Sequence, residues 1–178
     1  MSDAVVTLMQ RADRARGEHR LPDAHRDLLE AVALCRHTGT RRDLVRALKG
    51  LGQIERDLKR GDAALALYEE AVVICRGEDD ALALAHTLRH LGDIHRDAGR
   101  TELAGTCYRE ALAIYRDHEQ TSPLDLANAI RPLAILKDQS GDVEEAIRLW
   151  KEARDLYAAV DVGAGVAESS ARLARLTR

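Results

Sequence analysis

Two histidines, His86 and His90, stand four residues apart, which places both imidazoles on one face if the segment is helical. Such a pair can contribute ligands to a transition metal. Asp93 and His95 follow closely, but only His86 and His90 share a face, and a metal site needs three or more protein ligands. We therefore expect no metal and no cofactor, and interpret these histidines as solvated or groove-lining side chains.

No other catalytic signature is present in the sequence. It contains no Gly-rich loop ending in Gly-Lys-Ser/Thr, no Gly-x-Ser-x-Gly and no His-Glu-x-x-His. Gly163-Ala164-Gly165 follows no predicted strand and lacks the third glycine of a dinucleotide-binding loop. We expect a protein that is not an enzyme.

Composition favours a helical, globular chain. Its 178 residues carry 30 acidic and 27 basic side chains, a net charge of −3, and only 3% are aromatic, with no Phe. A sheet protein would draw more heavily on aromatic and β-branched residues. The negative charge and the scarcity of aromatics argue against nucleic-acid binding, although the segment 41–60 is locally basic. No apolar run approaches the roughly 18 residues of a membrane span, so we expect no membrane partner.

Three cysteines indicate a reducing compartment. Cys35, Cys75 and Cys107 have no Cys-x-x-Cys spacing, and their odd number argues against a disulfide framework. Cys35 and Cys75 are 40 residues apart, at equivalent places in a repeat, so we expect them to pack in the core. The first ten residues have no basic segment or sustained apolar stretch typical of a signal peptide. The predicted location is the cytoplasm, and the preference for Arg over Lys favours a bacterial source.

The sequence repeats itself with a period of 40 to 42 residues. Leu51-Gly52 aligns with Leu91-Gly92 and then with Leu133-Ala134, and each copy holds two segments with apolar residues at helical spacing. Small residues recur where two helices must approach closely: Gly52, Gly92, Ala134; Ala64, Ala104, Ala146; Ala71, Ala111, Ala153. The large residues that fill the resulting grooves are Tyr68, Tyr108 and Trp150.

This pattern resembles the tetratricopeptide repeat over nearly the whole sequence. The family's proline after the second helix is absent, and its place is taken by Arg36, Arg76, Arg116 and Ala158. We interpret these arginines as cations at the negative ends of helix dipoles. The period exceeds the 34 residues of the common repeat, which is similar to kinesin-light-chain-like members.

The expected fold is all-α: a right-handed α-solenoid of about four helix pairs plus a C-terminal capping helix, forming one domain over residues 1–178. Stacking is required because a single pair cannot bury its own apolar face. The expected repeats are 2–39, 40–79, 80–120 and 121–160, with the cap at 162–178. The expected helices are 3–18 and 22–37, 41–60 and 62–76, 80–98 and 101–118, 123–140 and 142–159, and 165–177.

Helix starts and stops follow from local residue types. Asp62, Thr101 and Asp142 are expected N-caps, and Ser122-Pro123 is expected to open a helix. Gly99 and Gly141 are expected to end the helices that precede them.

The resemblance implies that the first helix of each pair lines a concave surface. On those helices the face opposite the packing residues forms a stripe, here called the inner-face residues: Arg46, Lys49, Gln53, Arg56, His86, Arg89, Asp93, Arg96, Asn128 and Arg131. Lys49, Arg89 and Arg131 occupy the same place in consecutive repeats and have no adjacent acid, so they are the strongest candidates for contact with a ligand. The alternative is a solvated face with internal pairs, for example between Arg56 and Asp97.

A groove of this composition suits a carboxylate, because Arg and Lys supply charge-assisted donors. Family members that clamp a peptide carboxylate use Lys, Arg and Asn at similar places, and the match here is partial because Gln53 and Asp93 stand where Asn is usual. We predict a non-catalytic interaction module or scaffold that binds an acidic peptide segment of a partner protein. The alternatives are a bacterial peptide-sensing or regulatory protein of the same family, and a homo-oligomeric scaffold that self-associates through an end helix.

Overall fold

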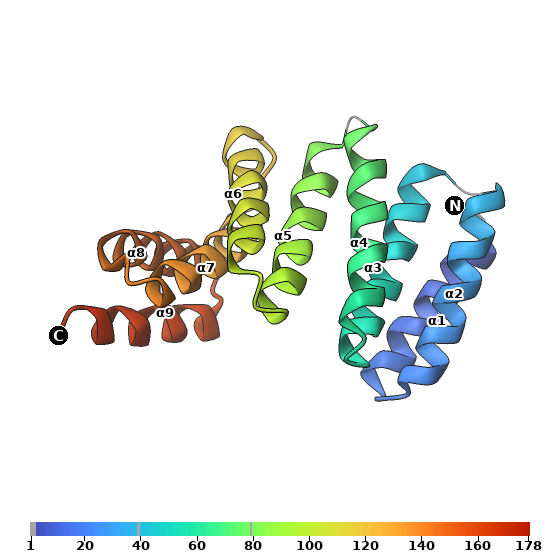
Figure 1. Cartoon of the computed structure of the whole chain (residues 1–178), viewed down its shortest axis with the longest axis horizontal. Helices are drawn as coiled ribbons and strands as arrows, with labels where there is room; N and C mark the ends of the chain where they lie inside the picture. Colours follow the sequence, from blue (N-terminus) through green and yellow to red (C-terminus); the bar gives the residue numbers. More distant parts are fainter. Residues whose placement is uncertain (1–2, 39, 79) are drawn as a thin grey trace. The chain divides into compact units, whose positions relative to one another are not determined.

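A computed structural model of the protein describes residues 3–38, 40–78 and 80–178. These residues form nine α-helices and no strand (Figure 1). The helices are α1 (Asp3–Gly17), α2 (Leu21–Thr38), α3 (Arg41–Asp57), α4 (Gly61–Arg76), α5 (Ala81–Asp97), α6 (Thr101–Asp117), α7 (Pro123–Gln139), α8 (Val143–Ala159) and α9 (Gly163–Leu176). The predicted all-α repeat class is confirmed, and each predicted helix is present with its ends shifted by a few residues. The predicted repeat limits at residues 2, 39 and 79 lie outside the described residues.

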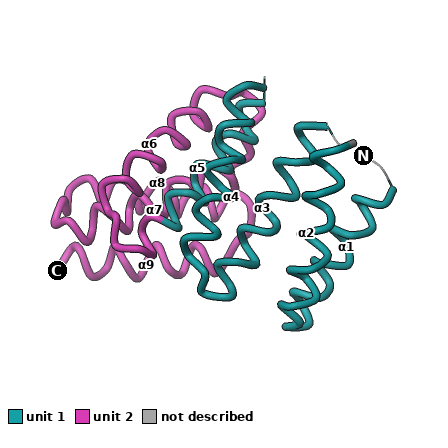
Figure 2. Tube along the Cα trace, turned by 45° about the vertical axis from the view of Figure 1, so that its right-hand side comes forward, with its two compact units in different colours: residues 1–94 teal, residues 95–178 magenta. Residues whose placement is uncertain are grey.

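The protein forms two compact units, residues 1–94 and residues 95–178 (Figure 2). In the first unit α1 packs on α2, α2 on α3 and α3 on α4. Its core consists of aliphatic side chains and alanines with a few per cent exposure or less, among them Val5, Leu28, Leu48, Leu51, Ile54 and Ala71. Tyr68, from α4, is also buried. None of the helices in the described residues combines the length and the apolar character that a membrane crossing needs.

In the second unit α6 packs on α7, α7 on α8 and α8 on α9. The buried side chains alternate between large and small, which lets neighbouring helices interlock. They include Tyr108, Ala111, Ile130, Leu149, Trp150, Ala153 and Tyr157. The positions that the repeat pattern assigns to helix contacts are therefore core positions in both units.

A left-handed residue recurs in the turn after the first helix of each pair. Gly99 and Gly141 have φ of 72° and 79°, which confirms the predicted ends of α5 and α7. His19 and Lys59 take the same conformation at the equivalent place, with φ of 59° and 63°. In these turns the next residue's N–H donates to a carbonyl five residues back, as from Arg60 to Glu55 at 2.8 Å. This is the bond of a Schellman motif.

Two predicted N-caps are wrong. α4 begins at Gly61, one residue before Asp62, and its N-cap is Arg60. α6 begins at Thr101 itself, and its N-cap is Arg100. Neither arginine makes a side-chain capping bond. The residue directly after the left-handed residue of the turn is the N-cap of the next helix, so both helices begin earlier than predicted. The position of Asp142 as the N-cap of α8 is confirmed.

Side-chain caps occur where the backbone passes from one pair to the next. The Thr40 hydroxyl accepts from the N–H of Asp43 at 3.2 Å, and the Ser122 hydroxyl accepts from the N–H of Asp125 at 3.1 Å. Pro123 occupies the first turn of α7, as predicted.

Candidate functional site

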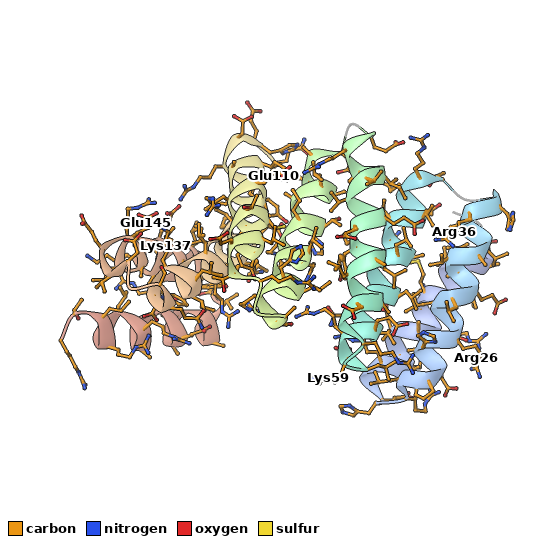
Figure 3. All side chains as sticks on the ribbon, in the orientation of Figure 1. Arg26, Arg36, Lys59, Glu110, Lys137 and Glu145 are labelled. Carbon is orange, nitrogen blue, oxygen red and sulfur yellow. The ribbon has the colours of Figure 1, made fainter. Side chains whose placement is uncertain are left out.

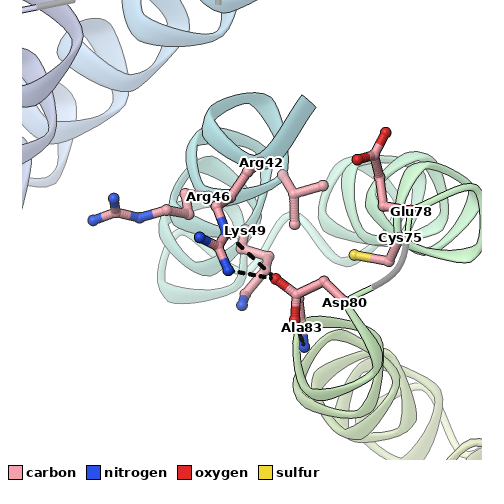
Figure 4. Close-up of a pocket in the computed structure, with 8 residues that line it drawn as sticks. Arg42, Arg46, Lys49, Cys75, Glu78, Asp80 and Ala83 are labelled. Carbon is pink, nitrogen blue, oxygen red and sulfur yellow. Dashed lines mark hydrogen bonds and ion pairs between the residues drawn. The ribbon is translucent and has the colours of Figure 1, made fainter. Parts of the chain in front are cut away.

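A pocket of about 510 Å³ lies in the first unit, between the N-terminal half of α3, the end of α4 and the start of α5 (Figure 4). Three cations from α3 line it: Arg42, Arg46 and Lys49. Arg46 and Lys49 are predicted inner-face residues. The other lining residues are Val45, Cys75, Glu78, Asp80 and Ala83. The structure thus brings two predicted cations together beside an apolar surface.

Each of the two acids that line this pocket, Glu78 and Asp80, forms an ion pair with an arginine. The Arg42 guanidinium donates to Asp80 Oδ2, with Nη2 at 3.0 Å (Figure 4). Arg41 lies 3.3 Å from Glu78. The other carboxylate oxygen of Asp80 accepts from the N–H of Ala83 at 3.0 Å at the start of α5, and this bond, with Arg42, lowers the pKa of Asp80. Asp80 therefore stays ionised and fixed in place.

Lys49 is the pocket cation without such an acid. It is half-buried, and within the described residues its ammonium makes no hydrogen bond and no ion pair. Burial lowers the pKa of Lys49, and the nearby guanidinium groups of Arg89 and Arg46 lower it further. An incompletely solvated ammonium that lacks an anionic partner is ready to bind one.

The sulfur of Cys75 lies at the same pocket. All three cysteines are free and buried, as predicted for Cys35 and Cys75. Cys75 Sγ is 3.8 Å from the hydroxyl of Thr87, and burial raises the pKa of its thiol. A raised pKa keeps the thiol protonated at neutral pH, which makes Cys75 a weak nucleophile.

Four further predicted or neighbouring polar residues cluster on α5. The rings of His86 and His90 are 4.6 Å apart between centroids. Arg89 Nη2 lies 3.1 Å from His90 Nε2, and His90 Nδ1 lies 3.6 Å from Asp93 Oδ2. The ring of Tyr68 from α4 lies 5.8 Å from that of His90.

His86 is held neutral. Burial is the main cause that lowers its pKa to about 3, and the positive charge of Lys49 adds to the effect. Among the described residues no three His, Cys, Asp or Glu side chains are arranged to hold a metal ion. The His86–His90 pair is a half-buried polar pair beside two cations.

The C-terminal half of α3 is engaged in internal contacts. Gln53 Nε2 donates to Asp57 Oδ1 at 2.9 Å, and Asp57 Oδ2 accepts from Arg16 Nε of α1 at 2.6 Å. Arg56 is half-buried, and its charge acts on the buried Tyr68. Gln53 and Arg56 thus interact within the protein, whereas Arg46 and Lys49 line the pocket, although all four belong to the predicted inner-face residues.

The predicted inner-face residues of the second unit all have intramolecular partners. Arg131 donates to both oxygens of Glu168 in α9, at 2.6 and 3.0 Å. Asn128 Oδ1 accepts from the hydroxyl of Tyr157 at 2.9 Å. Arg96 donates to Asp97 at 3.2 Å. No acid stands next to Arg131 in the sequence, and its partner in the structure comes from a helix 37 residues further along.

Arginines near the ends of second helices bridge successive repeats. Arg36 lies near the end of α2 (Figure 3). Its Nη2 donates to both oxygens of Glu70 in α4, at 2.9 and 2.8 Å. Arg116 of α6 contacts both oxygens of Glu152 in α8 in the same way, at 2.8 and 2.7 Å. The predicted place at a helix end is confirmed for both, and each also makes a specific contact with the next second helix.

Sequence reasoning missed part of the pocket wall. Arg42, Glu78 and Asp80 line the pocket, yet none lies on the predicted stripe. One signal was available: an acid follows several arginines by 34 to 41 residues, as Asp57 follows Arg16 and Asp80 follows Arg42. This separation is close to one repeat, so it points to pairs between neighbouring helix pairs.

Residues 43–117 match the family model of the tetratricopeptide repeat. Among solved structures, BtubC (BKLC) from P. vanneervenii is 20% identical with a TM-score of 0.79, and the match covers 88% of this protein and 64% of that one. A Podosopora anserina protein of the kinesin-light-chain type, with nearly identical TPR-like repeats, is 17% identical with a TM-score of 0.80, and the match covers 99% and 87%. A single-residue variant of that protein matches with a TM-score of 0.81.

The sequence spans less than two thirds of the length of BtubC. No curated protein matches it in sequence. Since the structural matches are at 20% identity or below, they establish the fold.

Proposed function

We propose that the protein, whose residues 43–117 match the tetratricopeptide repeat, is a non-catalytic interaction module that binds an acidic peptide segment of a partner protein at the Lys49 pocket. Repeats of this kind offer a preformed surface at little ordering cost. The three free, buried cysteines fit a reducing compartment, so the cytoplasm is part of the proposal.

The unpartnered ammonium of Lys49 is the observation that supports this proposal most directly. The two acids that line the pocket, Glu78 and Asp80, are already paired with Arg41 and Arg42, so an acidic ligand would supply the ion pair that Lys49 lacks. Val45 and Ala83 supply apolar contact area beside it. A carboxylate on a short aliphatic stem, as in Glu or at the C-terminus of a peptide, matches this combination of an ammonium and an apolar wall.

Direct binding of a defined peptide tests the proposal. The probe is a fluorescent hexaglutamate peptide with a free C-terminus, and its anisotropy is followed with the wild type and with Lys49→Glu. We expect Lys49→Glu to weaken binding about tenfold or more, a loss of about 1.4 kcal/mol. Equal affinity for both proteins would overturn the proposal.

Lys59→Glu is the matched control, because Lys59 is exposed in the turn between α3 and α4 (Figure 3) and the charge change is identical. We expect it to leave affinity within about twofold, since exposed charges at a distance are screened by salt. Raising the salt concentration should weaken wild-type binding for the same reason.

Two further arms identify the ligand group and the partner. An amidated hexaglutamate shows whether a terminal or a side-chain carboxylate is bound. Affinity capture with the wild type and Lys49→Glu as paired baits then identifies a natural partner, which only the wild type should retain. Capture of a nucleic acid, or of the protein itself alone, would contradict the proposed peptide partner.

A further inference from the structure

Lys49 shares one face of α3 with two arginines. Arg42, Arg46 and Lys49 follow one another at separations of four and three residues, so their side chains lie on the same side of the helix, and all three line the pocket of about 510 Å³ (Figure 4). A guanidinium keeps its charge at any physiological pH, whereas an ammonium can lose a proton. Among the lining residues that the structure describes, Lys49 is therefore the cation that can become a neutral amine.

The negative charge beside Lys49 is already shared with arginines. Asp80 accepts from Arg42 Nη2 and from the N–H of Ala83, both at 3.0 Å, and Glu78 lies 3.3 Å from Arg41. Within the described residues no acid pairs with the half-buried Lys49 ammonium.

The surroundings of Lys49 favour its neutral form. Burial lowers the pKa of Lys49, Arg89 and Arg46 lower it further, and Asp80 opposes them in part. Partial desolvation and a neighbouring cation are the two conditions that make a lysine amine nucleophilic, and both are met here.

The pocket also determines which reagent fits beside the amine. Its volume admits a small molecule, and Val45 and Ala83 form a wall against which a short acyl chain can lie. The positive charges of Arg42 and Arg46 attract an anionic group to the same space. A reactive carbonyl joined to an anionic leaving group matches this combination, and an acyl phosphate has both parts.

We propose that Lys49 is an acylation site that takes its acyl group from small acyl phosphates bound in this pocket. The phosphate lies against Arg42 and Arg46, and the ammonium of Lys49 first loses a proton to solvent. Its Nζ then attacks the carbonyl carbon, so that a C–N bond forms and the C–O bond to phosphate breaks. The electron pair of that bond leaves with the phosphate, which takes up the second proton of the amine. The products are an amide at Lys49 and inorganic phosphate, with no change of oxidation state.

Acylation has a consequence for the pocket. It removes the positive charge of Lys49 and its capacity to form an ion pair, so the modified protein no longer attracts an acidic peptide there. This regulatory consequence rests on the proposed function, whereas the modification itself requires only the pocket and its cations.

The protein provides internal controls for the test, because it has four lysines: Lys49, Lys59, Lys137 and Lys151. Lys59 and Lys151 are exposed, and Lys137 is paired with Asp142 at 2.6 Å. The folded wild type is incubated with acetyl phosphate at about pH 8, below the usual pKa of lysine, and peptide mass spectrometry follows the acetylation of each lysine.

We expect the initial rate of acetylation at Lys49 to exceed the rates at Lys59 and Lys151 by about threefold or more. In guanidinium chloride the four lysines should react at similar rates, because the unfolded chain has no pocket. Equal rates in the folded protein, or an acetyl group on Cys75 in place of Lys49, would overturn the proposed site. Selectivity that persists after unfolding would do so too, because it would come from the local sequence.

Arg46→Gln tests the part played by the neighbouring cations. It should reduce the rate at Lys49, because it removes a charge that favours the neutral amine and attracts the phosphate. Arg14→Gln is the matched control, because Arg14 is exposed in α1, and it should leave the rate at Lys49 unchanged. Circular dichroism checks that both variants are folded. An unchanged rate at Lys49 in folded Arg46→Gln would contradict activation by the pocket.

The two proposals fail in different ways. After acetylation, the affinity of the wild type for hexaglutamate should fall about tenfold or more, while treated Lys49→Arg, which keeps its charge, should change by less than about twofold. Selective acetylation that leaves peptide affinity unchanged overturns the proposed function and retains the acylation site. Binding that Lys49→Glu weakens, without selective acetylation of Lys49, overturns the acylation site and leaves the proposed function intact.

Discussion

The ring of Tyr68 lies directly against the backbone of Gly52, so that a Cβ at residue 52 would be 2.6 Å from Tyr68 Cε2. Both residues are buried. Gly52→Ala should therefore push the ring out of its site and lower the free energy of unfolding by about 1–3 kcal/mol. Urea denaturation measures the change. Gly61→Ala is the control, because a Cβ there meets no atom within 4 Å, and it should leave stability unchanged or slightly higher.

Ala111 in α6 is fully buried at a position where small residues recur. Ala111→Leu should overpack this contact and lower the free energy of unfolding by about 1–3 kcal/mol. Ala113→Leu, two residues along on the exposed side of the same helix, should change it by less than about 0.5 kcal/mol. Thermal denaturation of the two variants gives the comparison. Equal melting temperatures would show that the repeat register is misassigned at α6.

The low pKa of His86, about 3, predicts a pH-dependent stability. In the unfolded state the pKa returns to about 6.5, so the unfolded state binds more protons between these two values. The stability from a neutral His86 is complete above about pH 6.5 and is lost as the pH falls toward 3. We expect His86→Gln to remove part of this slope, on the order of 1–3 kcal/mol across the window.

Urea titrations at several pH values, compared between the wild type and His86→Gln, test this prediction. The slope with pH carries the information, because the substitution can shift stability at every pH alike. Parallel curves for the two proteins would mean that His86 titrates normally in the folded state.

The contact between Arg131 and Glu168 predicts that a charge swap restores what a single reversal removes. The two side chains are 41% and 29% exposed, so Arg131→Glu should cost about 1 kcal/mol. The double variant Arg131→Glu/Glu168→Arg should recover most of this. Urea denaturation measures the coupling, and hydrogen exchange of α9 localises it. A double variant no more stable than the single one would assign Arg131 a role other than this pair.

The helices and their contacts could be predicted because their causes lie within one repeat of sequence. Gly52 and Tyr68 recur with the period of the sequence, and Gly99 and Gly141 mark turns that need a positive φ. Where the same turn holds His19 or Lys59, the conformation could not be read from the residue type, because the repeat and not the residue imposes it.

The candidate site could be predicted in part. Lys49 and Arg131 occupy equivalent places, yet only Arg131 receives an acid from the following helix pair. Glu168 contacts Arg131, whereas Asp80, which lines the same pocket as Lys49, is paired with Arg42. Such partner choices depend on distances between helices 37 or 38 residues apart, and a stripe drawn along one helix does not contain them.

The bridges from Arg36 to Glu70 and from Arg116 to Glu152 have a consequence for how such a protein can evolve. Each joins one helix pair to the next through positions that recur, since Glu110 stands one period after Glu70. If residues 41–80 were deleted in frame, Arg36 would face Glu110 in place of Glu70. Duplication or loss of a whole repeat thus regenerates the same pair of charges. A gene of this kind can therefore change its length by recombination without new contacts having to arise.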